Sequence, residues 1–218
     1  MALAALSGDE QRIIFSKLCN VLDPGVAVNF SAVSSGLWVL TQALRQQLRA
    51  DHEAATALCR KVGMGSCKEL REAKEITLRE KCLTAAELAT LGQLGTVLPA
   101  LKNLCLIDRS AGAAGPDGVQ RLAEGLGAGA LPTVLALALC THIGDAGASA
   151  LAAALGRGAL PRLKFFALIF AAIGDAGLVA LVPALRRLIA LESIDLIGNP
   201  LGDEGLAALV APPPPAGA

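Results

Sequence analysis

The sequence lacks an excess of either charge. Among its 218 residues, Lys and Arg together number 19, and so do Asp and Glu. The balance also holds locally, with 11 basic and 10 acidic residues up to Val97 and 8 basic and 9 acidic residues after it. Proteins that bind nucleic acid or an anionic membrane usually present a basic surface. We therefore expect no nucleic-acid partner and no membrane partner.

Histidine is almost absent. The chain contains only His52 and His142, and neither has a Cys, Asp or Glu at the spacing of metal ligands or of a catalytic triad. The Gly-rich stretch at 125–129 follows an expected helix instead of a strand and lacks the Lys of a phosphate-binding loop. We expect no catalytic, cofactor-binding or metal-binding residues, and so a protein that is not an enzyme.

The sequence also lacks the features of a secretory signal and of a membrane span. Residues 1–6 are apolar, but they run at once into Asp9 and Glu10. The uncharged run Gly125–Gly144 is about long enough to span a bilayer, but it holds three glycines before Pro132 and follows the repeat described below. The six cysteines form no C-x-x-C pair, which is typical of free thiols in a reducing compartment. These features predict an intracellular, cytoplasmic protein, with the nucleus as the alternative.

What the sequence does contain is a fivefold repeat. The segment Ile-Gly-Asp-Ala-Gly at 143–147 returns at 173–177 and, as Leu-Gly-Asp-Glu-Gly, at 201–205. Apolar residues precede each copy at the spacing of a leucine-rich repeat: Val134, Leu137, Leu139 and Ile143; Leu163, Phe166, Leu168 and Ile173; Leu191, Ile194, Leu196 and Leu201. Two less regular copies lie upstream: Ala73, Ile76, Leu78 and Leu83; Leu101, Leu104, Leu106 and Ala111.

Each copy predicts a strand, a turn and a helix. The Leu-x-Leu alternation places two side chains on one face of a short strand. Gly then permits a turn, and Asp145, Asp175 or Asp203 is expected to cap the helix that follows it. The apolar period changes after the Asp from two to about 3.6 residues. Ala and Gly in the helices fit closely stacked backbones, which also accounts for an aromatic content of only 3%.

This pattern resembles the ribonuclease-inhibitor class of leucine-rich repeats, in which a full α-helix follows every strand. From Ile76 onward the strand positions recur after 28, 33, 29 and 28 residues, and the long step contains an insertion at 112–116. The resemblance implies an α/β leucine-rich-repeat solenoid of about five strand-turn-helix repeats with parallel strands and an α-helical N-terminal cap. The family's turn Asn, which ties adjacent turns together, occurs here only as Asn199 among five repeats. We therefore expect a less regular and less stable solenoid than a consensus one.

In this repeat class the outward strand face is concave and commonly binds proteins, so the resemblance implies a binding face here. One edge column of that face reads Arg79, Ile107, Cys140, Ile169 and Ile197, with Phe165 alongside. We expect Phe165, Ile169 and Ile197 to anchor a protein partner. Arg79 and Asp195 would supply charge at the ends. The alternative is that the N-terminal helices or the Pro-rich tail cover this strip.

The N-terminal 48 residues lack the repeat. Apolar residues at helical spacing, among them Ile13 and Val33, predict two or three short helices packed together. The runs at 6–18, 22–24 and 33–38 resemble an F-box, although Ser7 stands where Pro is usual and residues 34–36 lack the usual basic residues.

The expected organisation has four parts. The F-box-like segment at 1–48 is followed by a helical connector at 49–72 that caps the first repeat. The repeats fill 73–211, and a mobile, extended Pro-rich tail occupies 212–218.

The sequence favours a non-catalytic protein–protein interaction module. The first alternative is an F-box-type substrate receptor of a cullin ubiquitin ligase, with the ligase adaptor bound at the N-terminus and the substrate on the repeats. A GTPase-activating protein is a further alternative, because one such family uses this repeat class. The single turn Asn disfavours it.

Overall fold

The computed structural model describes residues 6–110 and 114–211. It divides into two compact units, Met1–Arg71 and Glu72–Ala218, which we call the N-terminal unit and the repeat unit. Residues 111–113, which include the start of the expected insertion at 112–116, and the expected mobile tail at 212–218 lie outside the described residues. In the part that is described, no helix has both the length and the apolar character needed to cross a membrane.

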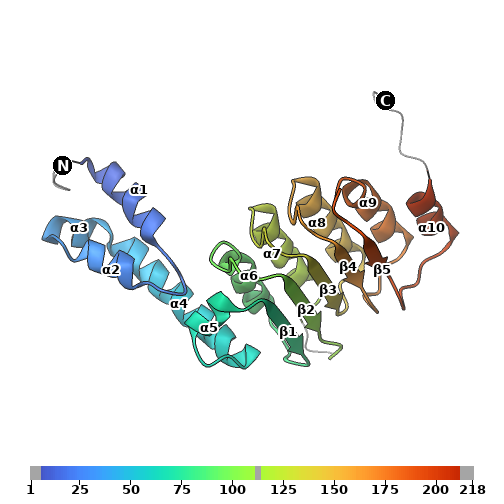
Figure 1. Ribbon diagram of the computed structural model, residues 1–218, viewed down its shortest axis with the longest axis horizontal. Coiled ribbons are helices and arrows are strands. Elements are labelled where there is room, and N and C mark those ends of the chain that lie inside the picture. The colour runs from blue at the N-terminus through green and yellow to red at the C-terminus, as the bar shows by residue number, and fades with distance from the viewer. Residues whose placement is uncertain (1–5, 111–113, 212–218) are drawn as a thin grey trace. The chain divides into compact units, whose positions relative to one another are not determined.

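The repeat unit is built on one parallel sheet whose five described strands follow one another in chain order (Figure 1). The strands are β1 Glu75–Arg79, β2 Asn103–Ile107, β3 Ala136–Cys140, β4 Phe165–Leu168 and β5 Ser193–Asp195. The residues that mark the repeat phase lie side by side in this sheet: Ile76, Leu104, Leu137, Phe166 and Ile194. The first four are at most 1% exposed. The predicted α/β solenoid of strand-turn-helix repeats is thus confirmed.

Helices α6 Ala85–Leu94, α7 Gly115–Gly127, α8 Gly144–Gly156, α9 Asp175–Leu185 and α10 Asp203–Val210 stack in the same order along one side of the sheet (Figure 1). Small residues let neighbouring helices approach closely. A Cβ atom added to Gly125 of α7 would lie 2.6 Å from the Cα of Gly92 in α6. Because real Cβ atoms do not approach carbon so closely, glycine is needed at this crossing.

The three aspartates of the Gly-Asp pairs were expected to cap their own helices, and this prediction is wrong. The Oδ1 atom of Asp145 instead accepts hydrogen bonds from the amides of Gly174 and Gly177, at 2.7 and 3.1 Å, at the start of the next repeat's helix. Asp175 likewise accepts from the amide of Gly202 at 2.7 Å. A capping residue must precede its helix, but Asp145 already lies inside α8. Asp145 and Asp175 therefore link repeats.

Asn199 ties two adjacent turns together, as the resemblance implies. Its Oδ1 accepts from the amides of Ala171 and Ile173, both at 3.1 Å. Its Nδ2 donates to the carbonyl oxygens of Leu168 and Leu196, at 2.6 and 2.8 Å. One side chain thus satisfies four backbone groups from two repeats.

Turns that lack this Asn use other acceptors. The two amides at 143–144 both donate to the carbonyl oxygen of Ala171 at 3.0 Å. The buried Asp108 accepts from the amide of Ser110 at 3.1 Å. Burial acts to raise the pKa of Asp108, but hydrogen bonds from Ser110 and from the amides at 82–83 outweigh it, so the pKa lies below its usual value. In this turn a buried carboxylate therefore accepts backbone hydrogen bonds, as the Asn side chain does in the last repeat.

The N-terminal unit is helical, as expected. Helices α1 Gly8–Leu18, α2 Gly25–Ser31 and α3 Ser35–Leu40 precede the long helix α4 Gln42–Val62 and the short helix α5 Cys67–Glu72. Its core forms around Phe15, Ala27 and Leu48. Ile13 and Val33, expected among the packed residues, are instead 60% and 63% exposed.

Helix α4 continues through the boundary that was expected between residues 48 and 49. Its sequence contains no Gly or Pro that would interrupt it. Gly63, in the left-handed conformation with φ 89°, ends the helix. The segment after residue 48 therefore shares a helix with residues of the core instead of starting a new element.

Candidate protein-binding face

The strands present alternate residues away from the helices, and their pairing sets those residues in rows. Arg79, Ile107 and Cys140 are paired in one row. The row continues past β4, because the amide of Ile169 donates to the carbonyl oxygen of Leu139 at 3.1 Å. The carbonyl oxygen of Ile197 accepts from the amide of Phe170 at 2.9 Å, which extends the row to the last repeat. We call Arg79, Ile107, Cys140, Ile169 and Ile197 the edge row.

Phe165 lies elsewhere on the face. It begins β4, whereas Ile169 follows the end of that strand, so roughly 13 Å of extended chain separates them at about 3.3 Å per residue. Phe165 is paired with Ala136 and Ser193. The expected single patch is therefore two apolar sites at opposite ends of the strands. Asp195 lies between them, paired with the buried Ala167.

Among the apolar residues of the edge row, the one in the last repeat is the most exposed. Ile107, Cys140 and Ile169 are half-buried, whereas Ile197 is 64% exposed. Arg79 is exposed at the other end of the row. The most accessible apolar surface in the row therefore lies at β5, next to the half-buried Asp195.

Phe170 and Arg109 adjoin the edge row and were not expected there. The guanidinium of Arg109 lies 4.3 Å from the centre of the Phe170 ring, a distance at which a cation and an aromatic face attract. The ring also lies against Gly198, where a side chain would collide with it. Phe170 is 46% exposed. The residues that follow the edge row in the five repeats include one aromatic among polar residues and glycine: Glu80, Asp108, Thr141, Phe170 and Gly198. That single aromatic is a signal that sequence reasoning could have used.

The thiols of this face are poor nucleophiles at neutral pH. Burial raises the pKa of both Cys105 and Cys140, and nearby Arg79 only partly opposes this. Both side chains therefore stay protonated, and their contribution to the surface is apolar contact.

The two histidines lie in a backbone contact and in a turn. The Nδ1 of His52 donates to the carbonyl oxygen of Val21 at 2.6 Å, and His142 is exposed in a turn. Among residues 6–110 and 114–211, no three His, Cys, Asp or Glu side chains come together as metal ligands would.

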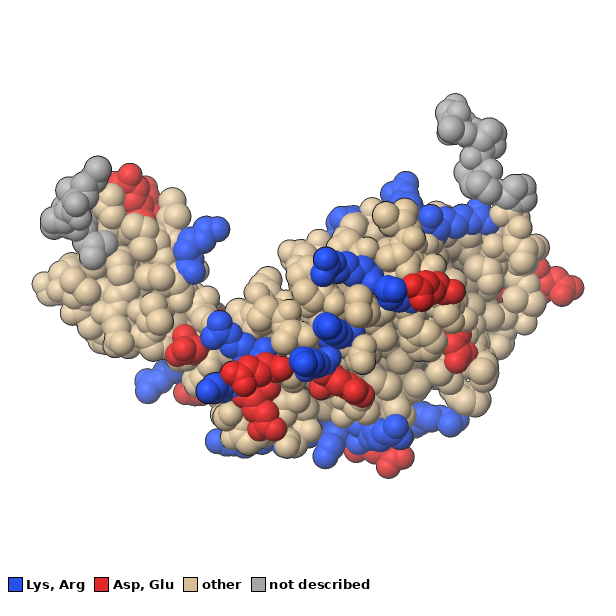
Figure 2. All heavy atoms as spheres, viewed as in Figure 1, with Lys and Arg blue, Asp and Glu red and all other residues tan. Residues whose placement is uncertain are grey.

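Charges of both signs are mixed on the surface of the repeat unit that Figure 2 shows, where blue and red side chains alternate without a large patch of one sign. This matches the even charge balance of the sequence. This face therefore does not favour a partner of one overall charge, and the specificity for any partner that binds it has to come from local contacts.

Comparison with protein families identifies the repeat. A profile described as Leucine Rich repeat matches residues 133–152 and 190–210, which contain β3 with the start of α8 and β5 with α10. The fold is a leucine-rich-repeat solenoid. Strands β1, β2 and β4 belong to the same series of repeats, since all five strands pair at equivalent positions of the repeat. A comparison with curated proteins gives no match.

Proposed function

We propose that the leucine-rich repeats, of the ribonuclease-inhibitor-like class, form a non-catalytic module that binds a protein on the concave strand face, in the cytoplasm. The observation that supports this most is the apolar end of the edge row. Ile169 is half-buried and Ile197 is exposed beside the aromatic ring of Phe170. Apolar side chains grouped in this way on a surface typically contact a partner.

Substitutions in the edge row test this proposal. Ile197→Asp places a charge where the side chain is already exposed, so the fold tolerates it, and Ile169→Asp tests the half-buried neighbour. Ile189→Asp is the matched control, because Ile189 is 98% exposed and lies outside the strands. Tagged variants are purified from cells, bound proteins are identified by mass spectrometry, and the affinity of the main partner is then measured with purified proteins.

We expect Ile197→Asp and Ile169→Asp to weaken that partner's binding by about tenfold or more, and Ile189→Asp to leave it unchanged. Full retention of the partner by both edge-row variants would show that the partner does not bind here.

A second candidate function is an F-box-type substrate receptor of a cullin ubiquitin ligase. One observation favours it: α1 to α3 and their connections present exposed apolar side chains, with Ile13 60%, Val33 63% and Val39 70% exposed. Such a surface on a small helical unit fits contact with an adaptor protein.

The adaptor test uses substitutions in the full chain, because a cut at residue 49 would sever α4. Val33→Asp and Val39→Asp are expected to abolish co-purification of a ligase adaptor and a cullin, while Ile197→Asp affects only the substrate. If no adaptor or cullin co-purifies with the unsubstituted chain, the receptor function fails and the strand-face proposal stands. Stimulated hydrolysis by a panel of small GTPases, the further alternative, is measured in parallel and is expected to stay at its basal rate.

A further inference from the structure

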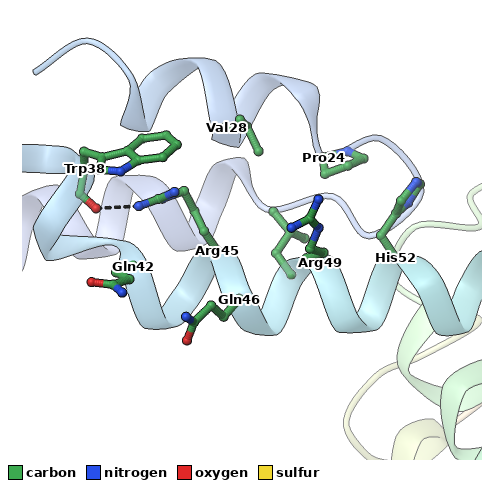
Figure 3. Close-up of a pocket in the computed structure, with 9 residues that line it drawn as sticks. Pro24, Val28, Trp38, Gln42, Arg45, Gln46, Arg49 and His52 are labelled. Atoms are coloured by element: carbon green, nitrogen blue, oxygen red, sulfur yellow. Dashed lines mark hydrogen bonds between the residues drawn. The ribbon is translucent and has the colours of Figure 1, made fainter.

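The N-terminal unit contains a groove that the strand-face proposal does not use. It has a volume of about 610 Å³ and lies between α4 and the helices that precede it (Figure 3). Pro24, Val28 and Trp38 line one side. Arg45, Arg49 and His52 of α4 line the other. Apolar and cationic side chains therefore face a single depression.

The aromatic wall is held in place by one of the cations. The guanidinium of Arg45 lies 3.3 Å from the centre of the Trp38 ring, and its Nη2 donates to the carbonyl oxygen of Trp38 at 2.6 Å. Its Nε also donates to the hydroxyl of Thr41 at 3.4 Å. These contacts fix both side chains, so the groove does not need to be ordered by a ligand.

The groove has an unbalanced charge. Its described lining includes two arginines and no Asp or Glu. Arg49 meets Glu53 at 3.8 Å, but their side chains are 83% and 72% exposed, and such a pair is weak in water. A carboxylate from a partner would find Arg49 accessible and incompletely neutralised.

The apolar lining is also accessible. Trp38 is 45% and Val28 39% exposed, so a ligand that fills the groove needs apolar as well as anionic groups. A nucleic-acid base would need a free indole face for stacking, and the Arg45 guanidinium already covers one face. An aliphatic side chain can instead pack on the ring edge and on Val28.

We propose that this groove binds an acidic peptide segment of another protein. An aliphatic side chain of the segment packs between Trp38 and Val28, and a neighbouring carboxylate pairs with Arg49. This site is separate from the strand face and does not depend on the function proposed for the repeats.

The chain provides its own probe, because Trp38 is its only tryptophan. The full chain is titrated with a short acetylated and amidated peptide made of Asp, Glu and Leu, and the fluorescence of Trp38 is recorded. The comparison peptides replace every acid by its amide or by Lys, and an oligothymidylate tests nucleic acid. We expect a saturable change with the acidic peptide alone, and weaker binding as salt is added.

Charge reversal locates the site. Arg49→Glu is expected to weaken binding of the acidic peptide about tenfold, because it places like charges together. Arg60→Glu is the matched control, an exposed arginine of the same helix that does not line the groove. Val28→Asp, which keeps both arginines, is expected to weaken binding as well.

Three outcomes overturn the proposal: equal binding of the amide peptide, equal affinity of Arg49→Glu and Arg60→Glu, or tighter binding of the oligothymidylate. Absence of any saturable change with the acidic peptide overturns it too. Loss of strand-face binding in the edge-row variants leaves this result unaffected, so the two proposals fail separately.

Discussion

At the scale of single residues, the aspartates of the repeat show how one side chain couples two repeats. The Oδ1 of Asp145 holds two amides of the next repeat, and Gly177 has no side chain at that point. A Cβ there would come within 2.5 Å of the same oxygen. The acidic residue and the glycine are therefore a matched pair across the repeat boundary, which explains why the two recur together along the sequence.

Asp145→Ala should lower the free energy of unfolding by about 1 to 2 kcal/mol, because two amides at the start of α9 lose their acceptor. Asp117→Ala is the control. Asp117 also lies in the first turn of its helix, α7, so both variants lose a favourable interaction with a helix dipole. Unfolding in urea, followed by circular dichroism, measures both. Equal losses for the two variants would mean that the bond between repeats contributes no stability.

At the scale of elements, the strands could be predicted from sequence because their signal is local. Alternating apolar residues such as Leu137 and Leu139 must share a face, and the repeat period fixes their phase. The partner of Asp145 could not be predicted in this way. Its two bonded amides lie 29 and 32 residues away, and only the stacking of helices brings them within reach.

The helices of the N-terminal unit show a second limit of sequence reasoning. Ile13, Ile14 and Phe15 are adjacent and all apolar, so periodicity alone does not decide which of them turns inward. Phe15 is fully buried and Ile13 is exposed. The groove was equally hidden from the sequence, because it brings Pro24 and His52 to one depression from separate elements.

The candidate site was predictable in part for the same reasons. The register of the edge row follows from the repeat, and Arg79, Ile107 and Cys140 align as expected. The separation of Phe165 from Ile169 depends on where β4 begins and ends. The stacking of Arg109 on Phe170 depends on turn geometry, which the period does not specify.

At the scale of the whole molecule, the repeats differ in how well their neighbours cover them. The apolar residues of the third repeat, Val134, Leu137, Leu139 and Ile143, are at most 1% exposed. Their equivalents in the last repeat, Leu191, Ile194, Leu196 and Leu201, are half-buried. Strand β3 pairs with strands on both sides, whereas β5 pairs within the described residues with β4 alone. In a solenoid each repeat is stabilised mainly by its neighbours.

Local opening should therefore begin at the last repeat. In native-state hydrogen exchange, we expect amides of β5 to exchange about tenfold faster or more than those of β3, because opening β5 exposes residues that are already half-accessible. Mass spectrometry of peptic fragments resolves the two strands. Equal protection would show that the repeat unit opens as one cooperative body. If a strand-face partner is found, its addition should slow exchange most in β5, since Ile197 follows that strand and is the most exposed apolar residue of the edge row.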